Sequence, residues 1–194
     1  MHLIIYGPEG SGKGTQAKLL SEHYRLPIIT SGDLVREMAE RDQSDIGNAC
    51  RQALKTGTYV SDNVMFEIWR QKLSSPESRK GFILDGFPRN VYQADFLLDQ
   101  VKKNGYGIDR AVYIRLSDEE AHRRLTKRSR KLFEGSSELH DSPERISHRL
   151  QTYRAKEQGT LDFFRKKNLL LDVNGEKEIE KVFKDIIAGL EPGS

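Results

Sequence analysis

Residues Gly7 to Thr15 have the composition and spacing of a phosphate-binding turn. The segment reads Gly-Pro-Glu-Gly-Ser-Gly-Lys-Gly-Thr and lies between an apolar run, Leu3–Tyr6, and the start of a helical pattern. Glycines allow backbone N–H groups to converge on an anion without obstruction by a Cβ atom. The start of a helix and the ammonium group of Lys13 add positive charge. This context predicts a P-loop, a site for nucleotide phosphates, without indicating a reaction.

The residue after Lys13 departs from the general P-loop pattern. Ser or Thr usually follows the lysine directly, whereas this chain has Gly14 there and Thr15 one position later. The shift leaves open how the loop would reach a magnesium ion. A glycine-rich turn without a ligand is the alternative interpretation.

Three arginines in the second half of the chain could hold a phosphoryl group. Arg124 and Arg128 are four residues apart and therefore share a helical face. Ser142-Pro143-Glu144 predicts the start of a further helix, and Arg149 follows within it. Guanidinium groups bind phosphate bidentately and stay charged. A loop joining the two helices could close these arginines around one phosphoryl group; the alternative is that they solvate helix surfaces.

Short apolar segments alternate with longer amphipathic ones, which is typical of a parallel sheet covered by helices. The predicted strands are Leu3–Tyr6, Pro27–Ile29, Phe82–Leu84, Ala111–Leu116 and Leu169–Val173. Helices are predicted over Gln16–Tyr24, Val91–Lys103 and Ile179–Leu190. Strands with few polar residues indicate burial on both faces. The predicted fold class is α/β.

Two segments interrupt this alternation and are predicted to be the moving parts. Ser31–Leu73 has helical patterns and no strand among them, so it is expected to be a helical insertion. Ser129–Asp141 contains Gly135-Ser136-Ser137 and little periodicity, which predicts an exposed loop that acts as a lid. The chain is then one domain, 1–194, whose core comprises residues 1–30, 74–128 and 142–194.

Composition excludes several classes of protein and does not identify a ligand. Of 194 residues, 36% are hydrophobic and 31% charged, and no apolar run reaches the roughly 20 residues of a membrane span. The single cysteine, Cys50, excludes an internal disulfide and a cysteine-rich zinc site, and with no secretory signal it favours the cytoplasm. The net charge of +3 indicates no partner, and the basic excess at Arg110–Lys131 fits a phosphate-rich ligand better than nucleic acid.

The motifs together resemble those of the adenylate kinase family. They are residues 7–15, Ser-Gly-Asp-Leu-x-Arg at 31–36 and Asp-Gly-Phe-Pro-Arg at 85–89, extended by Arg124–Arg128 and Arg149-Leu150. The resemblance covers nearly the whole chain. It implies a P-loop three-layer fold with a five-stranded parallel sheet, a helical AMP-binding insertion at 31–73 and a short lid at 129–141. It also implies a monomeric enzyme that moves a phosphoryl group from ATP to AMP with Mg²⁺, giving two ADP.

This resemblance carries over residue roles. It assigns ATP binding to Gly10, Ser11, Gly12, Lys13, Gly14, Thr15, Arg124, Arg128 and Lys177. It assigns AMP binding to Ser31, Arg36, Thr58, Tyr59, Val60, Gly86, Arg89, Gln93 and Arg149. Catalysis would fall to Lys13, Arg89, Arg128 and Arg149, which share the developing charge. Asp85 would act at magnesium through water; its alternative is a turn or capping carboxylate.

The choice of acceptor depends on two positions. Adenylate kinases have a glutamine at the position of Gln93, where the related UMP/CMP kinases typically have asparagine. Ser31 keeps the hydroxyl of the family's usual threonine, where UMP/CMP kinases favour alanine. Arg89 and Gln93 are expected to share a face at the start of a helix, so that one reaches a phosphate and the other a base. Both positions favour AMP, and a UMP/CMP or broad-specificity kinase is the alternative.

One lid position departs from the family pattern. Short-lid members usually carry Gly-Arg-x-Asp-Asp late in the lid, and Ser137–Asp141 aligns there, so Glu138 replaces a phosphate-binding arginine. Either Arg130 or Lys131 takes over, or the clamp is weaker and turnover slower. A nucleotide-binding module without transfer activity is the alternative from another class. The long zinc-binding lid of some relatives is excluded because its cysteines are absent.

Overall fold

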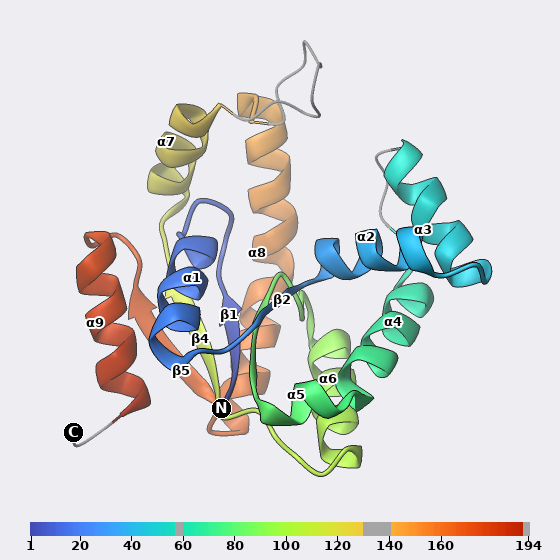
Figure 1. Ribbon diagram of the computed structural model, residues 1–194. Helices are drawn as coiled ribbons and strands as arrows, with labels where there is room; N and C mark the ends of the chain where they lie inside the picture. The colour runs from blue at the N-terminus through green and yellow to red at the C-terminus, as the bar shows by residue number, and fades with distance from the viewer. Residues whose placement is uncertain (57–59, 130–140, 192–194) are drawn as a thin grey trace.

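A sheet of parallel strands forms the centre of the computed structural model, which describes residues 1–56, 60–129 and 141–191 (Figure 1). The strands run in the order β2-β3-β1-β4-β5 across the sheet. They are β1 (His2–Tyr6), β2 (Ile28–Thr30), β3 (Phe82–Asp85), β4 (Arg110–Arg115) and β5 (Leu170–Asn174). Asp85 of β3 is paired with Ile5 of β1 and Thr30 of β2, so these strands end together at one edge of the sheet. The predicted five-stranded parallel α/β fold is confirmed.

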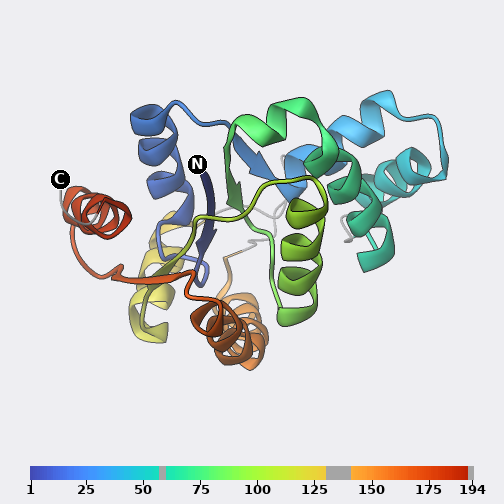
Figure 2. The ribbon, with the colours of Figure 1, turned by 90° about the horizontal axis from the view of Figure 1, so that it is seen from below.

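Helices cover both faces of this sheet and produce three layers (Figure 2). They are α1 (Lys13–Tyr24), α2 (Ser31–Arg41), α3 (Asp45–Thr56), α4 (Asp62–Ser74), α5 (Pro76–Lys80), α6 (Val91–Lys103), α7 (Asp118–Arg128), α8 (Pro143–Lys166) and α9 (Ile179–Leu190). Leu3 and Ile5 of β1 pack toward α1 and α9, whereas Ile4 and Tyr6 pack toward α4, α6 and α8. Because successive side chains of a strand alternate between faces, β1 is buried throughout, as its apolar sequence predicts.

Side-chain caps explain where the helices begin. The hydroxyl of Ser142 accepts a hydrogen bond from the Arg145 amide and Pro143 follows it, so α8 begins where the sequence predicts. Ser61 caps α4, because its hydroxyl accepts a hydrogen bond from the Val64 backbone N–H. The predicted bounds of α6 and α9 agree with the structure.

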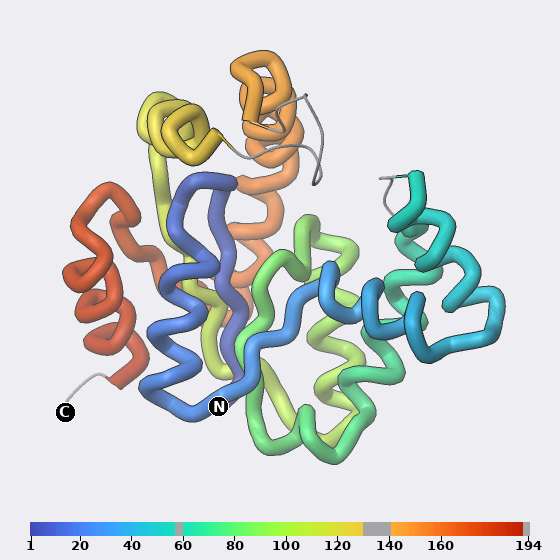
Figure 3. Tube along the Cα trace, turned by 45° about the horizontal axis from the view of Figure 1, so that its top comes forward, coloured from blue at the N-terminus to red at the C-terminus, as the bar shows by residue number. Residues whose placement is uncertain are grey.

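Three helices and no strand occupy the described part of the predicted insertion, 31–56 and 60–73. Helices α2 and α3 extend to one side of the sheet, and α4 returns to it beside α6 (Figures 1 and 3). Trp69 of α4 is fully buried and stacks on Phe87, with ring centroids 4.6 Å apart, so it packs the insertion against the core. Cys50 is also fully buried.

The predicted lid lies almost entirely outside the described residues, because only its ends, Ser129 and Asp141, are described. The structure therefore provides no test of Glu138, Arg130 or Lys131, and the boundaries of lid and insertion stay predictions. In the described ranges, every helix is too short or too polar to cross a bilayer.

Candidate active site

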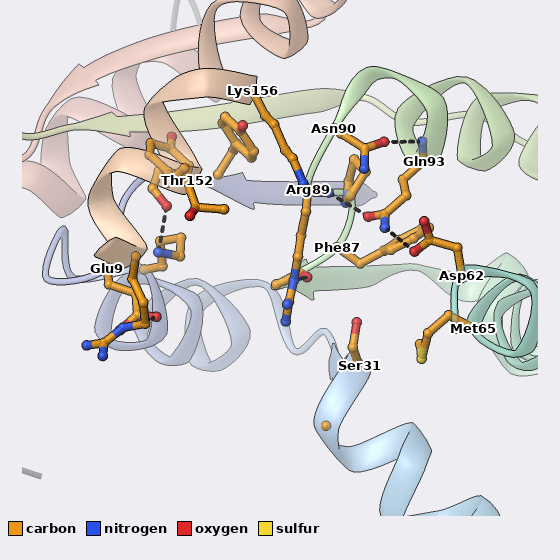
Figure 4. A pocket seen from close by; sticks show the side chains of 18 of the residues that line it. Glu9, Ser31, Asp62, Met65, Phe87, Arg89, Asn90, Gln93, Thr152 and Lys156 are labelled. Carbon is orange, nitrogen blue, oxygen red and sulfur yellow. Dashed lines mark hydrogen bonds and ion pairs between the residues drawn. The ribbon is translucent and has the colours of Figure 1, made fainter. Parts of the chain in front are cut away.

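A cavity of about 820 Å³ lies at the edge where β1, β2 and β3 end, within the size range of small-molecule sites. Its walls come from the P-loop, the starts of α2 and α4, the segment before α6, and α8 (Figure 4). Several residues predicted to bind nucleotides line it: Lys13, Ser31, Arg36, Val60, Gly86, Arg89, Gln93 and Arg149. Phosphate-binding and base-binding candidates from distant parts of the sequence therefore meet in one space.

The P-loop turns between β1 and α1 through backbone conformations that favour glycine. Gly7 has a φ of 148°, and a Cβ atom on it would lie 2.6 Å from the carbonyl oxygen of Ile114. Gly12 precedes α1 with a φ of 89°, and no side chain of the described residues caps that helix start. The positive end of α1 therefore faces the turn, which is the arrangement that binds anions.

Lys13 is the first residue of α1 and reaches back across the turn. Its Nζ donates hydrogen bonds of 2.7 Å to the carbonyl oxygens of both Gly7 and Pro8. Burial lowers the pKa of Lys13 to about 8, and the carboxylates of Asp85 and Glu9 oppose that shift. The ammonium group is thus fixed in place. An anion bound beside it would stabilise the protonated, charged form of Lys13.

Asp85 ends β3 beside the start of α1. A Cβ atom on Gly14 would lie 3.7 Å from its Oδ2, so the missing side chain at Gly14 leaves the carboxylate accessible from the P-loop. Burial raises the pKa of Asp85, and the positive charges of Lys13 and Arg89 oppose the rise. Among the described residues no three His, Cys, Asp or Glu side chains gather as a metal site. One carboxylate fits magnesium, which protein sites often bind through one or two carboxylates, waters and substrate phosphates.

Arg128 of α7 and Arg149 of α8 meet at the carboxylate of Asp141, whose side chain is fully buried. Arg128 donates to it from Nε and Nη2 over 2.8 and 2.9 Å, and Arg149 donates from Nη2 over 3.0 Å. The bond to Asp141 raises the pKa of Arg128. The two arginines also pair with Glu9 of the P-loop, at 3.2 Å for Arg149 and 3.6 Å for Arg128. The structure therefore brings two of the predicted catalytic arginines together beside the P-loop.

The remaining residues predicted to bind ATP lie around this site without lining the cavity: Gly10, Ser11, Gly12, Gly14, Thr15, Arg124, Arg128 and Lys177. Arg124 is held by Glu120 at 2.6 Å and reaches the carbonyl oxygen of Gly10 at 3.4 Å. Lys177 pairs with Asp185 of α9 across 2.5 Å. Their roles toward a nucleotide stay predictions.

The far side of the cavity combines apolar and cationic groups. Leu54, Val60 and Met65 provide apolar surface between the insertion helices and α6. Arg89 Nε donates to the carbonyl oxygen of Gly86 over 2.9 Å. Arg36 pairs with Asp33 across 2.6 Å and is more than half exposed. The predicted residues Thr58 and Tyr59 lie outside the described residues.

Gln93 is fixed at the far side of the cavity by three hydrogen bonds. Its backbone N–H donates to Asn90 Oδ1 (Figure 4). Its side-chain Oε1 accepts from the backbone N–H of Arg89, and its side-chain Nε2 donates to Asp62 Oδ1. Gln93 is only 8% exposed, so its side chain is not a solvated amide on the helix surface. The expectation that Arg89 and Gln93 share a helical face is wrong, because Asn90 caps α6 and Arg89 precedes the cap.

Comparison with known proteins identifies the family. Residues 5–169 match the family model described as adenylate kinase. The chain belongs to the adenylate kinase family. It is 35% identical to the adenylate kinase of Archaeoglobus fulgidus, with 98% of each chain covered. It is 35% identical to adenylate kinase 1 of Nostoc sp., with 97% of each chain covered, and 36% identical to the adenylate kinase of Leptospira biflexa, with 97% and 98% covered.

Three acidic residues of this adenylate kinase family member were not predicted as parts of the site. Glu9 and Asp141 hold the arginines, and Asp62 holds Gln93. Glu9 offered a signal, because a carboxylate within a phosphate-binding motif is electrostatically unfavourable and needs a cationic partner. Asp141 and Asp62 lie next to helix starts, where acids are common for other reasons.

Proposed function

We propose that this chain transfers the terminal phosphoryl group of ATP reversibly to AMP, giving two ADP, and so maintains the balance of adenine nucleotides. One observation carries the proposal. A single cavity has Lys13 and Arg149 beside the P-loop on one side and Arg89 and Gln93 on the other. Two nucleotides bound from these sides would meet with their phosphates between cationic groups.

The arrangement supports direct in-line transfer. An oxygen of the AMP phosphate attacks the γ-phosphorus of ATP, a new P–O bond forms, and the bond to the bridging oxygen of the β-phosphate breaks. The acceptor oxygen is already anionic, so no general base is needed. Lys13, Arg89, Arg128 and Arg149 bind the phosphate oxygens and stabilise the charge that spreads over them. Closure of the lid would exclude water as a competing acceptor.

Asp85 would hold Mg²⁺ through water at the C-terminal end of β3. When bound, the ion neutralises negative charge on the ATP phosphates. The accessible, single carboxylate beside Gly14 is the observation that supports this assignment. Thr15, in the first turn of α1, is the nearest hydroxyl that follows the P-loop lysine in sequence.

A coupled assay with ATP, Mg²⁺ and AMP, CMP, UMP or GMP tests the function. AMP is expected to give the highest kcat/KM, because Gln93 and the hydroxyl of Ser31 both line the acceptor side. Faster turnover with CMP or UMP would replace the AMP assignment with the UMP/CMP kinase alternative. ATP binding without ADP formation from any acceptor would favour a nucleotide-binding module, the alternative raised by Glu138. As for partners and location, we expect a cytoplasmic monomer that uses only small nucleotides.

Glu9 is predicted to weaken ATP binding. Its carboxylate lies in the P-loop, 3.6 Å from Nη2 of Arg128, which is predicted to bind ATP, and 3.2 Å from Arg149 Nε. It therefore competes with phosphate oxygens for these guanidinium groups. Glu9→Gln keeps the shape and removes the charge. We expect ATP to bind about three to ten times more tightly, since Glu9 is partly exposed and its repulsion is partly screened. Calorimetric titration of the variant with ATP measures the change.

Glu22→Gln provides the matched control for Glu9→Gln. Glu22 is an exposed residue of α1 that does not line the cavity, and its replacement changes the net charge equally. The control should leave ATP affinity unchanged. Equal or weaker binding by Glu9→Gln would mean that Glu9 supports the site by positioning Arg149.

A further inference from the structure

We propose that Asp62 is a specificity-determining positioning residue that locks the side-chain amide of Gln93 in one orientation. The locked amide admits bases with an acceptor ring nitrogen beside an exocyclic amino group and rejects their oxo counterparts. This inference rests on the proposed function, in which AMP is the acceptor, and it names the feature by which that acceptor is chosen.

The two neighbours of the Gln93 side chain allow only one orientation of its amide. The Arg89 backbone N–H can only donate, and it lies 2.8 Å from Gln93 Oε1. The Asp62 carboxylate can only accept, and it lies 3.2 Å from Gln93 Nε2. A rotation of the amide by 180° would place two donors opposite each other at Arg89 and two acceptors opposite each other at Asp62. Gln93 is only 8% exposed, so leaving the nitrogen and oxygen of its side-chain amide unsatisfied is costly. Asp62 and Arg89 are exposed residues, so the burial of Gln93 itself is what favours one orientation.

A locked amide keeps one donor and one acceptor in reserve. Each NH₂ group has two hydrogens and each carbonyl oxygen two lone pairs, and Asp62 and Arg89 use one of each. Gln93 lines the cavity, so the second N–H and the second lone pair are the groups it can offer to a base there. The apolar side chain of Met65 lies on the same side of the cavity as Asp62 and Gln93 (Figure 4), and Val60 also lines the cavity, so both provide apolar surface for a flat ring.

This donor and acceptor match the edge of a 6-aminopurine. The Nε2–H meets the unprotonated ring nitrogen N1, and Oε1 accepts from the 6-amino group. A 6-oxopurine in the same pose presents N1–H and a carbonyl oxygen, which reverses both roles and would require the amide to rotate. Cytosine presents the same order of groups as adenine, whereas uracil and guanine present the reversed order. The fixed amide therefore discriminates bases with an amino group from bases with an oxo group. Discrimination between AMP and CMP must come from the size of the base.

Asp62→Asn tests the lock because an asparagine amide can either donate or accept. The assay compares kcat/KM for AMP with that for inosine monophosphate, a 6-oxopurine, at saturating ATP and Mg²⁺. The wild type is expected to prefer AMP strongly. In the variant the AMP-to-IMP ratio is expected to fall about threefold, because the rotated amide now finds a donor at position 62 while the Arg89 N–H still opposes the rotation. A merely structural loss would lower both values and leave the ratio unchanged.

Asp95→Asn is the matched control, since Asp95 is an exposed residue of α6, the helix that carries Gln93, and lies outside the cavity lining. Its ratio should equal that of the wild type. Asp62→Ala provides a second variant, which removes the acceptor and should shift the ratio in the same direction. An unchanged ratio in both Asp62 variants, with AMP turnover intact in the wild type, overturns the lock alone. Absence of AMP turnover in the wild type overturns the proposed function and the lock with it.

Discussion

Replacement of Lys13 by methionine is expected to lower kcat/KM for the ATP and AMP reaction by about 10³-fold or more. Lys13 Nζ is held by two carbonyl oxygens of the P-loop and lines the cavity. A fixed cation in a site that excludes water stabilises transition-state charge more strongly than a cation in solution. Methionine has a similar length and no charge, so the loss reports on electrostatics. Initial rates in the coupled assay measure it.

Lys18→Met is the control for Lys13→Met, because Lys18 is an exposed residue of the same helix. Its activity should stay within about twofold of the wild type. A loss of less than tenfold in Lys13→Met would show that the arginines neutralise the phosphates without the lysine.

The dependence of ATP affinity on pH provides a second test of the role of the Lys13 ammonium group. The pKa of Lys13 is lowered by burial to about 8, below its ordinary value of 10.5. Below pH 8 the free enzyme already carries the ammonium group, so the contribution of this group to ATP affinity is fully present. Above pH 8 binding must take up a proton, so the dissociation constant is expected to rise with pH. Lys13→Arg stays charged and should remove this dependence, as calorimetry between pH 7 and 9.5 would measure.

Local sequence signals were enough to predict the strands, the P-loop and the starts of several helices. Apolar runs predicted β1 and β4, and Ser142-Pro143 predicted the start of α8 because capping depends on neighbouring residues alone. The start of α6 at Val91 was also predicted, but Arg89 lies before the capping residue Asn90 and is therefore not part of the helix. A spacing of four residues places two side chains on one helical face only when both residues are helical, so it was not enough to place Arg89 and Gln93 on one face.

The partners of Glu9 and Asp62 could not be predicted because they are distant in sequence. Glu9 meets Arg128 and Arg149, and Asp62 meets Gln93, only after the sheet and the insertion have formed. Asp62 and Asp141 also have ordinary local roles, since Asp62 begins α4 and Asp141 precedes the cap of α8. Composition and spacing therefore identify the cations that bind phosphate better than the carboxylates that position them.

Asp141→Asn is expected to lower kcat by about 10² and the free energy of unfolding by about 2 kcal/mol. The carboxylate of Asp141 is fully buried and binds two guanidinium groups, so its neutral isostere leaves Arg128 and Arg149 close together with like charge. The stability loss is placed below the roughly 3–5 kcal/mol of a fully buried pair, because Arg128 is 41% exposed and partly solvated. The rate falls because the arginines from α7 and α8 no longer hold one geometry. Urea unfolding and saturating kinetics measure the two effects.

A double-mutant cycle with Arg149→Met separates positioning from catalysis. If Asp141 acts through Arg149, the loss in kcat caused by Asp141→Asn should largely disappear when Arg149 is already replaced. Additive losses would mean that Asp141 affects the phosphates by another route. A higher kcat in Asp141→Asn would mean that its carboxylate competes with phosphate, as Glu9 is expected to do. The two acids contact the same arginines. A gain in ATP affinity in Glu9→Gln together with a loss of kcat in Asp141→Asn would show that Glu9 competes with phosphate, whereas Asp141 holds the arginines of α7 and α8 in position.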